Sequence, residues 1–469
     1  MSGKTISRRK FVRQNSIAGL GVIALSSTPY MITSCSGSAP AILGGRPVHK
    51  NGWPKWPQWN TETDEARFLE VLRSGVWSRS KVVSEFEQKW AGVCGTKRCL
   101  GVINGTNALI ASLVNLGIGG GDEVIVPPYT FVATVLAVLQ TGAIPVFADT
   151  DPETYQIDPE KIKQKITART KAILPVHILG MPADMIRIME IASEHKLLVV
   201  EDACQGWLAE INKKKVGSFG NAGCFSFQTS KNLPMGEGGA IVSDDEQFMD
   251  MCYSFHNYGH AYGTLVGAIG SGAVIGGTKL RMAEYQAVIG LLQLERLEEQ
   301  TGKRNENAAY LRKALSGIPG IKPAVLKEYV TRSADHIFAF RYDKDKFGGL
   351  SRLNFQKALI EEGIPCTGGY APLNKMEFIP SAFRTKNYKK MYPAELLDYN
   401  KYMEQNQCPV NDQLCDETVW LTQNLLLGTK EDMDDIIASI EKIQPNADKI
   451  ARMDNLVQRA QGQDYELRY

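Results

Sequence analysis

The sequence from residue 223 to residue 239 reads Gly223-Cys224-Phe225-Ser226-Phe227-Gln228-Thr229-Ser230-Lys231-Asn232-Leu233-Pro234-Met235-Gly236-Glu237-Gly238-Gly239. Lys231 lies among small and apolar residues, directly before a glycine-rich turn. Burial disfavours the charged form of a lysine and lowers its pKa, so a neutral amine becomes available to attack an aldehyde. The stretch therefore predicts a lysine suited to Schiff-base chemistry. A surface lysine before a turn is the alternative for this stretch taken alone.

An acidic residue ends an apolar stretch upstream of this lysine, in the sequence Val199-Val200-Glu201-Asp202. Cofactors of α/β proteins bind in the crevice outside the carboxyl ends of parallel strands, and Asp202 would point into that crevice. Pyridoxal phosphate (PLP) needs a carboxylate at its pyridine nitrogen, because the protonated ring acts as an electron sink. Asp202 is therefore a candidate partner for that ring, with a helix cap as the alternative role.

A candidate phosphate site lies at Gly105 and Thr106, where a strand gives way to the start of a helix. Free backbone N–H groups and the positive end of the helix dipole attract a phosphate there. Ser226 could add its hydroxyl to the same phosphate. Phe131, which follows the strand-ending Pro127-Pro128, could stack on a pyridine ring, although a core aromatic is an equally simple interpretation.

Short apolar strands alternate with amphipathic helices through the middle of the chain. Strands are expected at 124–126, 144–147, 172–176 and 197–200, and helices at 131–140, 159–166 and 186–195. This alternation predicts an α/β fold with a large, mostly parallel sheet covered by helices. A long helix over 282–309 would join it to a smaller C-terminal α/β domain, with a strand at 336–342 and helices at 351–362 and 430–443.

In their order along the chain, these pieces resemble the DegT/DnrJ/EryC1/StrS family of sugar aminotransferases. The similarity runs from about Gly44 to Tyr370 and includes 121–127, 149–151, 170–173, 176–177, 201–203 and the lysine stretch. The sequence Arg281-Met282-Ala283-Glu284-Tyr285-Gln286-Ala287 is similar to the branch that acts on cyclitol ketones such as scyllo-inosose or makes aminohydroxybenzoate. The resemblance implies a fold-type I PLP enzyme that forms a homodimer with shared active sites.

The resemblance also implies a role for each candidate residue. Lys231 would bind PLP covalently and Asp202 would pair with the pyridine nitrogen. The remaining cofactor contacts would be Gln205 to the ring hydroxyl, Phe131 stacked on the ring, and Gly105, Thr106 and Ser226 at the phosphate. A dehydratase offshoot of the family replaces the lysine with histidine, so Lys231 favours transamination. Where the family usually has an asparagine that reaches the partner's phosphate, this chain has Lys279.

The first forty residues are typical of an address rather than of a folded domain. Arg8 and Arg9 precede an uncharged apolar run at 17–24, the pattern of a twin-arginine (Tat) export signal. Ile32-Thr33-Ser34-Cys35 is similar to a lipobox, which predicts a lipid anchor at Cys35 and a periplasmic or membrane-anchored protein. A basic tail on a cytoplasmic protein is the alternative. We expect an export signal over 1–40, an arm over 41–63, a large PLP-binding domain over 64–300, a small domain over 301–446 and a polar tail over 447–469.

Composition excludes several classes of protein. Lys+Arg 53 against Asp+Glu 51 leaves a net charge of +2, too even for a nucleic-acid binder. No cysteines form a C-x-x-C motif, and only the pairs Cys94/Cys99 and Cys408/Cys415 are close enough in sequence to suggest disulfides. We expect no metal site, since Gly259 argues against a helix that would align His256 with His260. His177 follows a strand and is a candidate substrate contact, with a structural role as the alternative.

The sequence thus predicts a PLP-dependent aminotransferase that moves an amino group from glutamate or glutamine to a keto-sugar or cyclitol ketone. Two alternatives remain at this stage. A PLP-dependent lyase would use the same Lys231 and Asp202, and an exported, non-catalytic binding or sensor protein could be built on the same fold.

Overall fold

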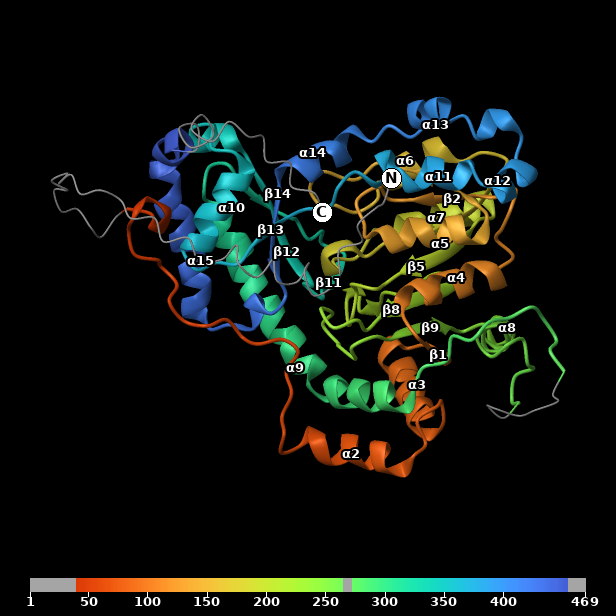
Figure 1. Cartoon of the computed structure of the whole chain (residues 1–469). Coiled ribbons are helices and arrows are strands. Elements are labelled where there is room, and N and C mark those ends of the chain that lie inside the picture. Colours follow the sequence, from red (N-terminus) through yellow and green to blue (C-terminus); the bar gives the residue numbers. More distant parts are fainter. Residues whose placement is uncertain (1–38, 265–271, 454–469) are drawn as a thin grey trace, which may run out of the picture. The chain divides into compact units, whose positions relative to one another are not determined.

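The computed structural model describes residues 39–264 and 272–453, and its elements are labelled as in Figure 1. The predicted export signal, including Cys35, falls almost entirely outside these residues. A seven-stranded sheet has the order β1-β9-β8-β5-β4-β2-β3. Its strands are β1 (Arg98–Val102), β2 (Glu123–Val126), β3 (Ile144–Phe147), β4 (Thr170–Ile173), β5 (Leu198–Asp202), β8 (Ala222–Ser226) and β9 (Gly239–Ser243).

The pairing within this sheet confirms the predicted fold class. Neighbouring strands from β3 through β2, β4 and β5 to β8 are parallel, and β9 pairs antiparallel with both β8 and β1. Parallel strands need crossover helices, and the sequence supplies one between most of them. The helices of this part are α3 (Lys81–Cys94), α4 (Gly105–Asn115), α5 (Val132–Thr141), α6 (Pro159–Lys165), α7 (Met185–His195) and α8 (Glu246–His256).

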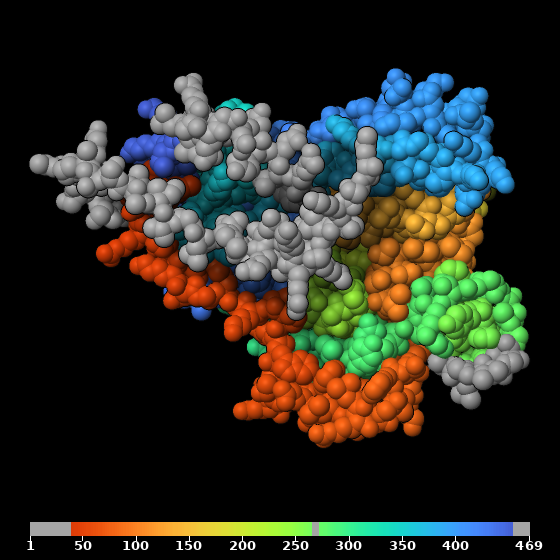
Figure 2. Space-filling view, viewed as in Figure 1, coloured from red at the N-terminus to blue at the C-terminus, as the bar shows by residue number. Residues whose placement is uncertain are grey.

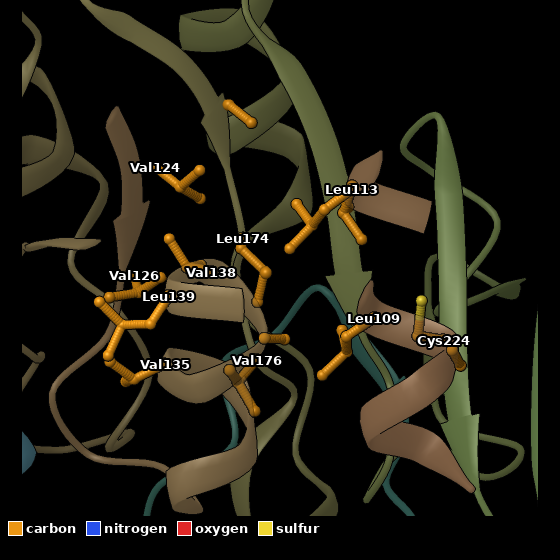
Figure 3. Packing of buried hydrophobic residues seen from close by; sticks show 14 of the residues in the cluster. Leu109, Leu113, Val124, Val126, Val135, Val138, Leu139, Leu174, Val176 and Cys224 are labelled. Atoms are coloured by element: carbon orange, nitrogen blue, oxygen red, sulfur yellow. The ribbon is translucent and has the colours of Figure 1, made fainter. Parts of the chain in front are cut away.

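Both faces of the sheet are buried. Successive strand residues point to opposite sides, and the side chains on each side belong to hydrophobic clusters. On β2, Val124 and Val126 join one hydrophobic cluster while Ile125 joins another. The first cluster packs against α4, α5 and α8, and the opposite face packs against α3, α6, α7 and α9. Figure 3 shows the first cluster, where side chains of α4 and α5 meet those of β2 and of the segment that follows β4: Leu109, Leu113, Val135, Val138, Leu139, Val124, Val126, Leu174 and Val176.

A second, smaller sheet lies in the C-terminal part and has the order β10-β12-β14-β13, with antiparallel pairs throughout. It consists of β10 (Ile321–Pro323), β12 (Ile337–Tyr342), β13 (Thr367–Gly368) and β14 (Thr418–Thr422), covered by α10 (Arg352–Glu361) and α15 (Lys430–Ile443). A three-stranded sheet of β6 (Glu210–Ile211), β7 (Lys214–Lys215) and β11 (Val330–Arg332) lies apart from both.

The long helix α9 (Glu284–Leu315) connects the two hydrophobic cores, as Figure 1 shows. Ala287 and Leu291 belong to a cluster of the large sheet, and Leu311 and Leu315 belong to that of the small sheet. Upstream, residues 44–63 run without regular structure to α2 (Asp64–Ser74).

Two parts of the C-terminal half differ from the expected division. Residues 447–469 were expected to form a polar tail outside the small domain, yet Ala447 and Ile450 are buried in the small-sheet core. The segment with α11 (Phe378–Phe383), α12 (Lys386–Met391), α13 (Tyr399–Gln405) and α14 (Pro409–Glu417) packs largely against the large sheet instead.

Side-chain hydroxyls bond the segment from α11 to α14 to the large domain. Figure 2 shows this segment in light blue against the orange of the large domain. The Tyr388 hydroxyl donates to the carbonyl oxygens of Leu139 and Ala143, and the Tyr402 hydroxyl donates to that of Pro145 at 2.7 Å. The Phe147 N–H at the free edge of β3 donates to Asn406, so the segment also covers an edge strand.

Several further predictions concern chemical groups rather than folds. The eight cysteines among the described residues are all free, so neither suggested disulfide forms. Within residues 39–264 and 272–453, no group of three or more His, Cys, Asp or Glu side chains is arranged to hold a metal ion. In the same part of the chain, no helix has the length and apolarity needed to cross a membrane.

Candidate active site

A cavity of about 580 Å³ lies at the carboxyl ends of β5 and β8, beside the first turn of α4. Strand order explains this position, since parallel strands deliver their ends to one edge of the sheet. The cavity is lined by every predicted cofactor-binding residue except Lys279: Gly105, Thr106, Phe131, Asp202, Gln205, Ser226 and Lys231.

Lys231 lies in the loop between β8 and β9, and its amine is 5.9 Å from the centre of the buried Trp207 ring. Although part of the side chain is exposed, burial of the amine lowers the pKa of Lys231 below its ordinary value. Nearby Cys204 and Asp202 oppose this shift in pKa without cancelling it. The cavity thus holds an amine that becomes neutral, and therefore nucleophilic, more readily than a free lysine.

Asp202 ends β5 and is almost fully buried. One carboxylate oxygen accepts a hydrogen bond from the Thr134 hydroxyl at 2.7 Å, and the other accepts from the Cys204 N–H at 3.1 Å. Both donors hold the carboxylate in one orientation at the cavity wall. A carboxylate fixed in this way can keep a ring nitrogen protonated.

The first turn of α4 forms the opposite end of the cavity. Asn104 caps the helix by accepting from the Asn107 N–H, and Gly105 follows it at the closest approach to β8. A Cβ atom at Gly105 would lie 2.7 Å from both Cys204 Sγ and Ser226 Cβ, so only glycine fits there. Backbone N–H groups of this turn, together with the Thr106 and Ser226 hydroxyls, are suited to bind a phosphate.

Gln205 and Phe131 complete the predicted set. Gln205 is held on both sides, because its carbonyl oxygen accepts from the Leu179 N–H at 2.8 Å and its amide donates to the Tyr370 hydroxyl at 2.9 Å. Phe131 precedes α5, lines the cavity and is 56% exposed as a residue. Such exposure leaves the side chain accessible to a ligand.

His177 does not line the cavity, which corrects its assignment as a substrate contact. It is fully buried, with Nε2 3.0 Å from the Glu201 carboxylate and Nδ1 accepting from the Ala183 N–H. Its role is therefore the structural alternative. Lys279 is exposed and also lies outside this chain's cavity, as a residue directed at a partner subunit would; its role stays a prediction.

The outer wall comes from the C-terminal part, and the sequence predicted none of it. It consists of His336, Ile337, Tyr370 and Trp420. Tyr370 and Trp420 pack edge to face, with ring centres 4.6 Å apart. Burial lowers the pKa of His336 and raises that of Tyr370, so both rings are neutral near pH 7. No local motif surrounds these residues, and only the folding of distant segments brings them to Lys231.

The cavity fits PLP on the chemistry of its donors and on its shape. An amine with a lowered pKa, an oriented carboxylate and a helix N-terminus with a glycine that leaves room for a phosphate lie around one space. PLP carries an aldehyde, a pyridine nitrogen and a phosphate that match these three groups.

The family model of the DegT/DnrJ/EryC1/StrS aminotransferases matches residues 58–441. The chain belongs to this family. A spore coat polysaccharide biosynthesis protein, SpsC, of Bacillus subtilis is 34% identical over 389 residues, covering 81% of this chain and 94% of that protein. An L-glutamine:2-deoxy-scyllo-inosose aminotransferase of Micromonospora echinospora is 32% identical over 420 residues, covering 87% of this chain and 98% of that protein.

Solved structures of similar enzymes have the same fold as this chain. The structure of 3-amino-5-hydroxybenzoic acid synthase superposes with a TM-score of 0.74 at 29% identity, covering 86% of this chain and 99% of that one. DesI, solved in the presence of its TDP-sugar product, superposes with a TM-score of 0.72 at 26% identity, covering 90% of this chain and 99% of that one. The chain therefore has the fold of the type I PLP enzymes and is a PLP-dependent aminotransferase, as predicted. The binding-protein and lyase alternatives are set aside.

Proposed function

We propose that the protein moves the amino group of glutamine or glutamate to the ketone carbon of a cyclitol or keto-sugar, with Lys231 carrying the cofactor. The observation that carries this proposal is the single cavity in which Lys231 and Asp202 meet beside the first turn of α4. Relatives named as glutamine-dependent inosose aminotransferases support the choice of donor and acceptor.

PLP, when bound, supplies an aldehyde for covalent capture of amines and a ring that accepts electrons. In our proposal Lys231 holds the cofactor until the amino donor replaces it. The freed amine then moves the α-proton of the donor as general base and acid, a task for which its lowered pKa suits it. Asp202 keeps the ring nitrogen protonated, and the first turn of α4 with Ser226 holds the phosphate.

The outer wall supports an acceptor that is an uncharged ring. Tyr370 and Trp420 offer flat apolar surfaces, while the Tyr370 hydroxyl offers a hydrogen bond. Among the described residues of this chain, Lys231 and the neutral His336 are the basic side chains that line the cavity. A nucleotide diphosphate would therefore find little positive charge on this wall, which favours a free cyclitol or sugar over a nucleotide-linked sugar.

The visible spectrum of the purified protein tests the proposal. Glutamine or glutamate, added alone, should convert the PLP spectrum to that of pyridoxamine phosphate (PMP), and scyllo-inosose should then restore it. A nucleotide-linked keto-sugar at the same concentration should restore it at least about tenfold more slowly. A spectrum that neither donor changes would refute aminotransfer from these donors, and full turnover by Lys231→Ala would refute the role of Lys231.

We also propose a homodimer, in which Lys279 reaches the phosphate of the partner subunit. In support, Val76, Trp77 and Tyr285 are apolar side chains that are 50%, 55% and 43% exposed, and the Glu284 N–H bonds to the Trp77 carbonyl. An exposed patch of this kind is typical of an interface. Sedimentation should give a dimer that Trp77→Asp dissociates, and Lys279→Ala should weaken PLP binding; a monomeric wild-type protein would contradict both.

Export through the Tat pathway, with a lipid anchor at Cys35, is a further proposal supported by Arg8, Arg9 and the apolar run after them. Tat carries folded proteins, so the enzyme could bind its cofactor before it leaves the cytoplasm. Replacing both arginines by lysine should hold the protein in the cytoplasm, and Cys35→Ser should release it from membranes. A wild-type protein found only in the cytoplasmic fraction would refute this proposal.

A further inference from the structure

The N-terminal arm, residues 41–63, runs from the small domain to the large one. At its start Ala41 and Val48 donate their N–H groups to the buried Glu362 carboxylate, and the Trp53 indole donates to the Gly363 carbonyl at 2.9 Å. At its end the Gln58 carbonyl accepts from Gln293 of α9 at 2.7 Å. Both ends of the arm are therefore fastened, and Trp56 lies between them.

The Trp56 indole contacts the main chain of the loop between β8 and β9, which carries Lys231. Its Nε1–H lies 3.1 Å from the Thr229 carbonyl oxygen and 3.2 Å from that of Lys231, a shared hydrogen bond to both. No other donor among the described residues reaches either carbonyl oxygen. This contact therefore joins the arm to the peptide group of Lys231 itself.

The indole is itself held in place from behind. The Arg304 guanidinium lies over its ring, 5.1 Å from the centre, and donates to Gln423 Oε1 through Nε and Nη2 at 3.0 and 2.6 Å. Arg304 is fully buried, which lowers its pKa to about 9, and its Nη1 has no hydrogen-bond partner among the described residues. A buried cation is stabilised by electrostatic attraction to the face of an aromatic ring, so the Arg304 guanidinium and the Trp56 ring hold each other in place.

The loop around Lys231 is fixed on both sides of the lysine, but its backbone at Lys231 is held by the Trp56 indole. The Asn232 side chain donates to the Ala334 carbonyl and lies 2.9 Å from His336, which fixes the loop beyond the lysine. Thr229 bonds to Gly236 across the turn, which fixes it before the lysine. Between these two points, among residues 39–264 and 272–453, the indole of Trp56 is the only group from outside the loop that bonds to the backbone oxygens.

We propose that Trp56 is a positioning residue for Lys231: by holding the Thr229 and Lys231 carbonyls, the arm sets where the lysine amine stands in the cavity. This inference rests on the proposed covalent attachment of the cofactor to Lys231. PLP is bound through that lysine and PMP is not, so misplacing the lysine weakens only the PLP form. A merely structural role would weaken both forms alike.

The test is the dissociation constants of PLP and PMP for the full-length protein and for Trp56→Phe, which keeps a ring over Arg304 but loses the N–H. The Kd of PLP should rise about fivefold, the factor for one hydrogen bond of about 1 kcal/mol, while that of PMP stays within about twofold. Trp53→Phe is the matched control, since it removes an indole hydrogen bond from the same arm at Gly363. Both constants should be unchanged in that variant.

Two results would overturn the inference: an unchanged Kd for PLP in Trp56→Phe, or an equal loss of affinity for PLP and PMP. An equal effect of Trp53→Phe on PLP would also overturn it, because the arm as a whole would then be responsible. Lys231→Ala separates this inference from the proposed function. If that variant binds PLP as tightly as the wild type, the covalent attachment fails; if it does not and Trp56→Phe is unchanged, the inference about Trp56 alone fails.

Discussion

Thr134 provides a sharp test of how Asp202 works. Thr134→Val keeps the shape of a buried side chain but removes the hydroxyl that donates to the Asp202 carboxylate at 2.7 Å. Hydrogen bonds to charged groups contribute about 1.5–3 kcal/mol. If the transition state depends on this carboxylate, the rate constant falls about 10- to 150-fold.

The assay is the single-turnover rate with glutamine, followed through the change in the cofactor spectrum. Thr130→Val is the control, because the Thr130 hydroxyl lies 3.0 Å from that of Thr134 and has no hydrogen bond to Asp202. We expect less than about a fivefold effect there, as for one neutral hydrogen bond. A Thr134→Val enzyme that is folded and within twofold of the wild-type rate would refute the reasoning.

Two other predictions follow from the cavity. Burial lowers the pKa of Lys231 below the ordinary 10.5, so its neutral fraction saturates at lower pH; the rate at which the cofactor-free protein binds PLP should rise with pH and level off below pH 10.5. A rate still rising at that pH would contradict the shift. Gly105→Ala places a Cβ 2.7 Å from Cys204 Sγ and Ser226 Cβ, and should raise the Kd of PLP about 5- to 150-fold, as overpacking typically costs about 1–3 kcal/mol. Gly92→Ala, whose Cβ meets nothing within 4 Å, should leave that Kd unchanged, and equal effects of the two would argue against the steric cause.

Three of the residues predicted correctly as cavity residues lie at the end of a regular element. Asp202 and Ser226 end β5 and β8, and Gly105 begins α4. Parallel strands place such ends at one edge of the sheet whatever the rest of the chain does. The helices were also predictable, because α15 was expected at 430–443 and spans Lys430–Ile443. Periodicity and capping residues are local signals, and local backbone conformation follows from them.

His177 shows where that reasoning fails. It follows a strand as Asp202 does, but its ring turns to the buried Glu201 and away from the cavity. The direction of a side chain after the last strand residue depends on which partners surround it. Neither the carboxylate nor the Ala183 N–H that it bonds could be assigned to it from the pattern.

Sequence by itself thus determined the fold class, the family and the half of the cavity formed by strand ends and the first turn of α4. Tertiary structure alone decided the other half. Tyr370 and Trp420 reach the cavity because β13 and β14 pair, and Trp56 reaches the Lys231 loop because the arm is fastened at both ends. The physical reason is the range of the interactions: periodicity and capping act within a few residues, whereas these contacts join segments from about fifty to more than three hundred residues apart and form only when those segments have packed together.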